Sequence, residues 1–210
     1  MAFQRRDPNK PPRQIVKPIP QAVPYDVIEA TADLYLSPKS KLLYCWLYLT
    51  GQRISEALEV KRGDLTLADE DGENYFIVDS ITEKNPHQPR RKIPVALNGI
   101  ESTLANFVWD SVKDLRPELK IHYFSRQNAF NNLTKVSIPC DFMIESTKKR
   151  YSSRLSINPH YLRHCRATHL VDLYGYEKGR LERFMGWSSD KMANTYVSLD
   201  WRDLATGLKR

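Results

Sequence analysis

The sequence has no apolar run long enough for a membrane-spanning helix, and its basic start leads into no apolar core of a signal peptide. A membrane span needs about 20 predominantly apolar residues, and an export signal needs such a core. We therefore expect a cytoplasmic protein with no membrane partner. Cysteine is also scarce, since only Cys45, Cys140 and Cys165 occur, without close pairing. Three scattered cysteines fit reduced thiols rather than a disulfide framework.

Metal-ligand spacings are missing as well. His164, His169 and Cys165 lie close in sequence, but the chain has no Cys-x-x-Cys or His-Glu-x-x-His motif, so packed or solvated roles are favoured over a metal site. No acidic cluster with metal-ligand spacing occurs either, which argues against a metal-dependent nuclease. We expect no metal site.

Positive charge is in excess. The 32 Lys and Arg residues outnumber 25 Asp and Glu, giving a net charge of +7, and this balance favours a polyanionic partner such as nucleic acid. Many basic proteins simply have solvated Lys and Arg faces, so charge alone does not decide. The 210 residues, 41% of them hydrophobic, can bury one full core, which predicts one globular domain.

Residues 1–24 differ in composition from the rest, with six of the thirteen prolines and the basic residues Arg5, Arg6 and Arg13 among others. Such a segment is typical of an extended basic arm, which could lie along a phosphate backbone. A disordered tail or a linker is an equally good interpretation. Residues 25–210 are expected to form the globular domain.

The periodicity of that domain predicts mainly helices. We expect them at 25–36, 39–50, 53–60, 99–115, 126–134 and 159–173, with short helices over 178–208. The apolar run at 74–81, the polar turn at 82–91 and the strand from Lys92 to Leu97 predict an antiparallel β-hairpin with a long basic loop. The fold class is therefore mainly α with a small antiparallel β-hairpin (α+β).

Two segments place arginine at a helix N-terminus, where free backbone N–H groups favour an anion. Arg53 follows Gly51 at the start of one helix, although a lone arginine there is usually a surface residue. His160 and Arg163 share one face of a helix that Asn158 caps, with Pro159 at its first position.

A third segment has Trp187 nine residues before Tyr196. Singly, these are more often core aromatics, and helix, turn and helix here could also indicate a DNA-reading helix-turn-helix. The order of all three segments matters more than any one of them.

Taken together, the motifs resemble the tyrosine recombinase (phage-type integrase) family from about Leu42 to Val197. That family has a T-G-x-R-x-x-E box, a lysine in a β-hairpin turn, an H-x-x-R box, a G-H or G-W pair, and a tyrosine nine residues beyond the pair. The matching residues here are Thr50, Gly51, Arg53 and Glu56, then Lys84, His160 and Arg163, Gly186 and Trp187, and Tyr196.

The resemblance implies a tyrosine recombinase catalytic-domain fold and a site-specific recombinase that needs no metal, ATP or other cofactor. By resemblance, Tyr196 is the nucleophile that forms a 3′-phosphotyrosyl bond, Arg53 and Arg163 grip the phosphate, and His160 handles a proton or bonds the phosphate. Trp187 would donate its indole N–H in place of the commoner histidine. Glu56 would hold a catalytic side chain, or form an ordinary helix salt bridge.

Lys84 would protonate the leaving oxygen by the same resemblance. Its turn is about two residues longer than the common family hairpin, so Lys92, Arg90 and Arg91 remain alternatives. A basic hairpin whose Arg90 and Arg91 contact only the DNA backbone is the simpler interpretation.

The implied partners are double-stranded DNA and three further copies of the chain, as a homo-tetramer on paired sites. Family members usually carry a separate core-binding domain before the catalytic one, and we expect it to be absent from these 210 residues. A DNA-binding protein that has lost catalysis and a type IB topoisomerase are the alternative functions.

Overall fold

The computed structural model describes residues 22–82, 90–144, 149–188, 190–194 and 196–197, and the side chains of these residues except 139–155, 190 and 191. The elements in chain order are α1 (Tyr25–Ala32), α2 (Pro38–Thr50), α3 (Ile54–Glu59), the 3₁₀ turn η1 (Arg62–Asp64), β1 (Leu65–Glu70), β2 (Glu73–Ile81), β3 (Arg90–Ala96), α4 (Ser102–Val112), α5 (Arg126–Thr134), β4 (Ser137–Ile144), β5 (Lys149–Ser156), α6 (Pro159–Asp172), α7 (Lys178–Met185) and α8 (Asp190–Ala193).

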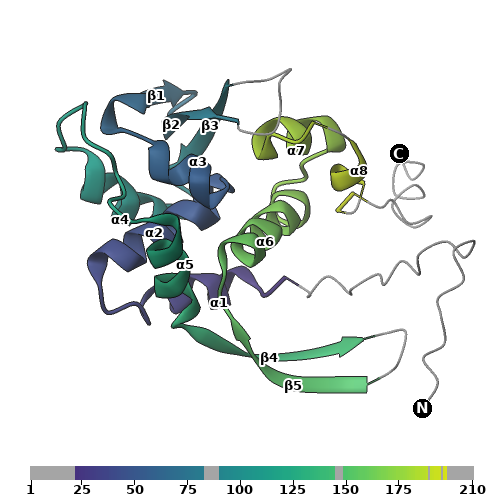
Figure 1. The fold of residues 1–210 in the computed structure, drawn as a ribbon. Helices are drawn as coiled ribbons and strands as arrows, with labels where there is room; N and C mark the ends of the chain where they lie inside the picture. Colours follow the sequence, from purple (N-terminus) through teal and green to yellow (C-terminus); the bar gives the residue numbers. More distant parts are fainter. Residues whose placement is uncertain (1–21, 83–89, 145–148, 189, 195, 198–210) are drawn as a thin grey trace, which may run out of the picture.

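The predicted fold class is confirmed, because helices form the body and the β1–β2–β3 sheet is small and antiparallel. In Figure 1 this sheet lies at one end of the helical body and the β4–β5 hairpin extends from the other. No helix in the described part of the chain is both long and apolar enough to cross a membrane.

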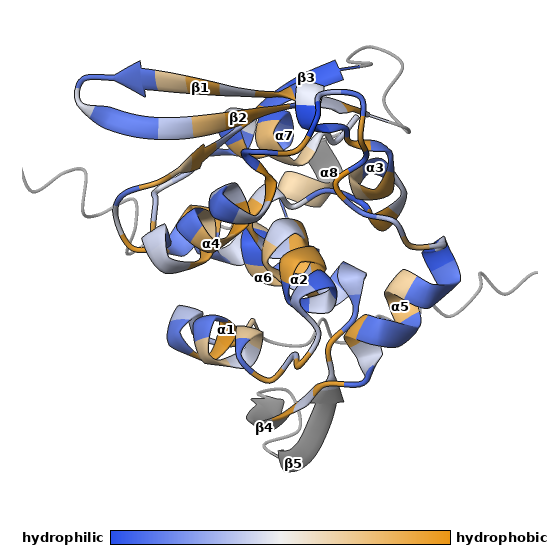
Figure 2. Ribbon diagram, turned by 90° about the vertical axis from the view of Figure 1, so that its left-hand side faces the viewer, coloured by the Kyte–Doolittle hydropathy of each residue, from blue (hydrophilic) through white to orange (hydrophobic). Residues whose placement is uncertain are grey.

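Helix α2 is the centre of the core. Nine of its side chains are buried, including Trp46 and Tyr48, and it packs against α4, α5 and α6 (Figure 2). A helix that is apolar on nearly every face must be surrounded by others. It ends at Gly51, whose left-handed φ of 57° lets its N–H bond the Leu47 carbonyl, and this sharp stop begins the Arg53 segment.

Two polar links hold that segment against the core. The indole N–H of Trp46 donates to Gln52 Oε1 at 2.6 Å, and Gln52 Nε2 donates to Ser80 Oγ on β2 at 2.6 Å. Trp46 also stacks on Phe76 of β2, with ring centroids 6.3 Å apart. These contacts fix the start of α3 relative to the sheet.

The sheet has one strand more than predicted. β1 pairs with β2 through a two-residue turn in which Asp71 and Gly72 both have positive φ, 56° and 80°, as an Asp-Gly hairpin turn requires. Only Leu65 of β1 is buried, so this edge strand lacks the alternation that would have revealed it.

The β4–β5 hairpin was not predicted at all. Its two strands pair antiparallel from Ser137 with Ser156 to Ile144 with Lys149. The β5 sequence KRYSSRLS has almost no apolar residues, and periodicity predicts a strand only when one face is apolar.

Candidate active site

Glu56 is the centre of the site. Its carboxylate is buried and accepts from the Arg53 backbone N–H at 3.0 Å and from Arg53 Nη1 at 2.6 Å, at the start of α3. Arg91 Nη2 donates to the same carboxylate at 3.2 Å. Burial alone would raise the pKa of Glu56, but Arg91 and the Arg53 donors outweigh it and hold that pKa below its usual value.

Arg91 lies inside the domain rather than on the surface of the basic hairpin. In β3 exposed and buried residues alternate, and Arg91 shares the buried face with Ile93 and Val95. Its side chain is 1% exposed, and Nε and Nη1 have no hydrogen-bond partner among the described residues. Arg90, one position earlier, faces outward and pairs with Asp79 at 3.0 Å.

Arg163 enters the same site from α6, which begins as predicted: Asn158 Oδ1 accepts from the Tyr161 N–H at 2.9 Å, with Pro159 in the first turn. The buried guanidinium donates to the carbonyls of Gly51 and Met185. Burial, reinforced by the charges of Arg53 and Arg91, lowers the pKa of Arg163 to about 9. Three arginines around one carboxylate leave an excess positive charge that favours an anion.

Tyr196 lies beside this cluster. Its ring stacks on Trp187 at 5.5 Å and 15°, and the Arg163 guanidinium lies 5.9 Å from the Trp187 ring centroid. The Tyr196 hydroxyl is 3.1 Å from Nδ1 of His164. Burial raises the pKa of Tyr196, and Arg163 partly opposes that shift, so the phenol is protonated at neutral pH.

Helix α6 carries three histidines, and two of them, His160 and His164, lie one turn apart near Arg163. His160 is exposed at the start of the helix, whereas His164, which sequence reasoning assigned to packing or solvent, contacts the hydroxyl of Tyr196. Its position one helical turn after His160, on the same face, was the available signal.

Several predicted residues lie outside the described part of the chain, namely Lys84 in the hairpin turn and Arg5, Arg6 and Arg13 in the N-terminal arm. Lys92 is described and exposed. Among the described residues, no group of three or more His, Cys, Asp and Glu side chains is placed to hold a metal ion.

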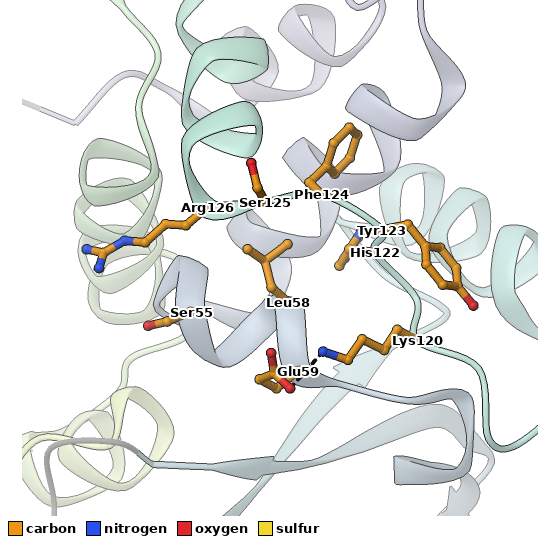
Figure 3. Close-up of a pocket in the computed structure, with 9 residues that line it drawn as sticks. All are labelled: Ser55, Leu58, Glu59, Lys120, His122, Tyr123, Phe124, Ser125 and Arg126. Carbon is orange, nitrogen blue, oxygen red and sulfur yellow. Dashed lines mark hydrogen bonds and ion pairs between the residues drawn. The ribbon is translucent and has the colours of Figure 1, made fainter.

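A pocket of about 390 Å³ lies on the side of α3 that faces the segment before α5 (Figure 3). Lys120 crosses it to pair with Glu59 at 2.8 Å. None of the predicted catalytic residues lines this pocket, which is formed by Ser55, Leu58, Glu59, Lys120, His122, Tyr123, Phe124, Ser125 and Arg126.

Gly186 lets the backbone at the end of α7 lie close to the guanidinium of Arg91. It has a left-handed φ of 64°, and a Cβ on it would overlap Nη1 of Arg91 and lie 2.8 Å from Cζ. We expect Gly186→Ala to lower the free energy of unfolding by more than the roughly 1–2 kcal/mol of left-handed strain, because Arg91 must also leave Glu56. Urea unfolding measures the loss.

Gly175→Ala is the matched control for this prediction. Gly175 has nearly the same φ, 63°, but no described atom lies within 4 Å of the position that a Cβ would take there. Equal losses in the two variants would show that the Arg91 overlap is unimportant.

Residues 25–202 match the sequence profile of the phage integrase family. The chain belongs to this family. It is also 27% identical over 172 residues to the tyrosine recombinase XerC of Bacillus pumilus (strain SAFR-032), a match that covers 79% of the chain and 52% of that protein. A second XerC, from Proteus mirabilis, is 25% identical over 81% of the chain and 50% of its own length. The chain therefore spans about half the length of these curated relatives.

Solved structures show the same fold at low sequence identity. The integrase chain superposes on the XerA recombinase with a TM-score of 0.59, at 14% identity, over 91% of the chain and 66% of XerA. The superposition on the XerH recombinase bound to its difH substrate has a TM-score of 0.56, at 18% identity. It covers 91% of the chain and 54% of XerH. The predicted tyrosine recombinase catalytic-domain fold is thereby confirmed.

Proposed function

We propose that this integrase-family chain is a site-specific DNA recombinase, which cleaves and rejoins DNA strands through a 3′-phosphotyrosyl intermediate at Tyr196. The observation that carries the proposal is the position of Tyr196 beside a cluster of three arginines, of which Arg91 and Arg163 are buried. Phosphoryl transfer to a side chain needs a nucleophile next to donors that stabilise the charge on the nonbridging oxygens. Arg53, Arg163 and Tyr196 supply these parts within one site.

The arginines can still accept a phosphate while they hold the site together. Arg163 uses one N–H of each Nη for the carbonyls of Gly51 and Met185, and a guanidinium has five N–H donors. Arg53 is the more open of the two, with a side chain 24% exposed. Glu56 holds Arg53 for this task, and Trp187 packs against the Tyr196 ring and offers its indole N–H to the phosphate.

The leaving 5′-oxygen needs a proton, and Lys84 is our candidate donor. The two neighbouring arginines are less suitable, because Arg91 is bound to Glu56 and Arg90 to Asp79, and an arginine rarely gives up its proton. The exposed Lys92 stays the alternative donor. His160, exposed beside Arg163, is proposed to bond the scissile phosphate when DNA is bound. The reaction as proposed uses no metal, ATP or other cofactor.

The proposed partner is double-stranded DNA, with a homo-tetramer assembled on paired sites. The net charge of +7 and the exposed Arg90 support DNA binding, and so does the likeness to XerH, which was solved bound to its difH substrate. Arg5, Arg6 and Arg13 would add backbone contacts from the arm.

A covalent trap tests this function. We would incubate the protein in EDTA with nicked suicide duplexes that carry candidate sites, and expect an SDS-resistant protein–DNA adduct. Proteolysis and mass spectrometry of the adduct should place the nucleotide on the peptide that contains Tyr196. Tight binding without an adduct on every substrate would instead favour a DNA-binding protein that has lost catalysis.

A further inference from the structure

His164 makes the closest described polar contact of the proposed nucleophile. Its Nδ1 lies 3.1 Å from the Tyr196 hydroxyl oxygen, and the two ring centroids are 5.4 Å apart. Trp187 stacks on the same tyrosine ring, and Tyr161 lies 6.2 Å from the His164 ring. Both partners of the hydrogen bond are therefore held by neighbouring aromatic rings.

The other titratable groups around the site are poor acceptors for the Tyr196 proton. Cys165, which raises the pKa of Tyr196, is a buried thiol. Arg53 and Arg163 are cations with no acceptor atom. Both oxygens of Glu56 already accept from Arg53 or Arg91. His160 lies one helical turn earlier than His164, about 6 Å along the axis, and no described residue is hydrogen-bonded to its exposed ring. His164 is left as the acceptor in contact.

We propose that His164 is a catalytic residue that removes the proton of Tyr196 during strand cleavage; this rests on the proposed function. As the bond between Tyr196 Oη and phosphorus forms, the bond from phosphorus to the 5′-oxygen breaks. The phenol proton moves to Nδ1 of His164, and the 5′-oxygen takes a proton from Lys84. In rejoining, the 5′-hydroxyl attacks phosphorus, and His164 returns the proton to Tyr196.

Neutral imidazole is the competent form of such a base. An imidazole loses its proton between about pH 5 and 8, a range in which Arg163, with its pKa of about 9, stays charged and Glu56, with its lowered pKa, stays ionised. The rate of cleavage should therefore rise with pH in this range.

The test compares single-turnover adduct formation by the full chain and its His164→Leu, His164→Asn and His160→Leu variants on the suicide duplex. General base catalysis contributes about 10²–10⁴-fold, so we expect both His164 variants to be at least about 10²-fold slower. Asparagine can hold the tyrosine by a hydrogen bond but cannot take its proton. In the wild type the rate should level off once the imidazole is neutral. Without that base only the Tyr196 phenolate can attack, so we expect the rate of both His164 variants to keep rising with pH, and the levelling to persist in His160→Leu.

A modified substrate separates the base from the acid. Sulfur in place of the bridging 5′-oxygen leaves as a thiolate, which needs no proton because a thiol is far more acidic than an alcohol. The modified DNA should restore the rate of adduct formation in a slow Lys84→Ala variant but not in the His164 variants. Equal melting temperatures and equal DNA affinities would show that the variants are folded.

Three outcomes would overturn the inference while the wild type still forms its adduct. They are a His164→Asn rate near that of the wild type, an unchanged pH profile in His164→Leu, and restoration of His164→Leu by the sulfur substrate. Absence of any wild-type adduct on a tightly bound site would instead remove the proposed function, and this inference with it.

Discussion

Tyr196→Phe is expected to abolish the covalent adduct while leaving the protein folded and bound to DNA. Phenylalanine removes the oxygen that we propose attacks phosphorus but keeps the ring that stacks on Trp187. The structural loss is one hydrogen bond, to His164 Nδ1, and a single hydrogen bond contributes about 0.5–1.5 kcal/mol to stability. Denaturing gels of the suicide reaction measure the adduct, and gel shifts on the same duplex measure binding.

Tyr174→Phe is the matched control. Tyr174 is nearby in sequence and 39% exposed, and it interacts with Arg166 rather than with the arginine cluster. This variant should form the adduct at the wild-type rate. An adduct that survives Tyr196→Phe would assign the nucleophile to another residue and disprove the central role of the Trp187–Tyr196 pair.

The motifs behind the family resemblance named several residues that the fold brings together. Arg53, Glu56, Arg163, Trp187 and Tyr196 come from segments far apart in the chain, and all lie around one site in the structure. Arg53 and Glu56 lie at the start of α3, Arg163 lies in the second turn of α6, and Trp187 and Tyr196 follow α7 and α8. Sequence signals such as Gly51 and Asn158 mark the starts of α3 and α6. The spacing therefore constrained three-dimensional position through well-marked local structure.

Contacts within the site could not be predicted in the same way. The motif points to His160, but the rotation of α6 relative to the Tyr196 segment decides which histidine contacts the hydroxyl, and that rotation depends on packing. The burial of Arg91 was predictable in principle. Ile93 and Val95 define the buried face of β3, and side chains two residues apart in a strand point to the same face. Its positive charge suggested a DNA contact instead.

Arg163→Lys is expected to slow strand cleavage by about 10²–10³-fold, the loss typical of one missing donor to a developing oxyanion. Lysine has three donors on a single nitrogen, so it cannot reach the carbonyls of Gly51 and Met185 and also the phosphate. The same change leaves a buried carbonyl unpaired, which costs roughly 1–3 kcal/mol of stability. Single-turnover rates and urea unfolding measure the two effects.

Two comparisons separate the stabilisation of phosphate charge by Arg163 from its role in holding Gly51 and Met185. They are the Arg53→Lys variant and an uncharged substrate. The Arg53 side chain is 24% exposed and its fork holds no backbone carbonyl among the residues described, so Arg53→Lys should slow cleavage with a smaller loss of stability. A methylphosphonate at the cleavage site carries no charge on its nonbridging oxygen and needs fewer cationic donors. It should therefore narrow the rate gap between Arg163→Lys and the wild type. If the gap stays as wide, Arg163 acts by holding Gly51 and Met185 in place, and stabilisation of phosphate charge rests on Arg53.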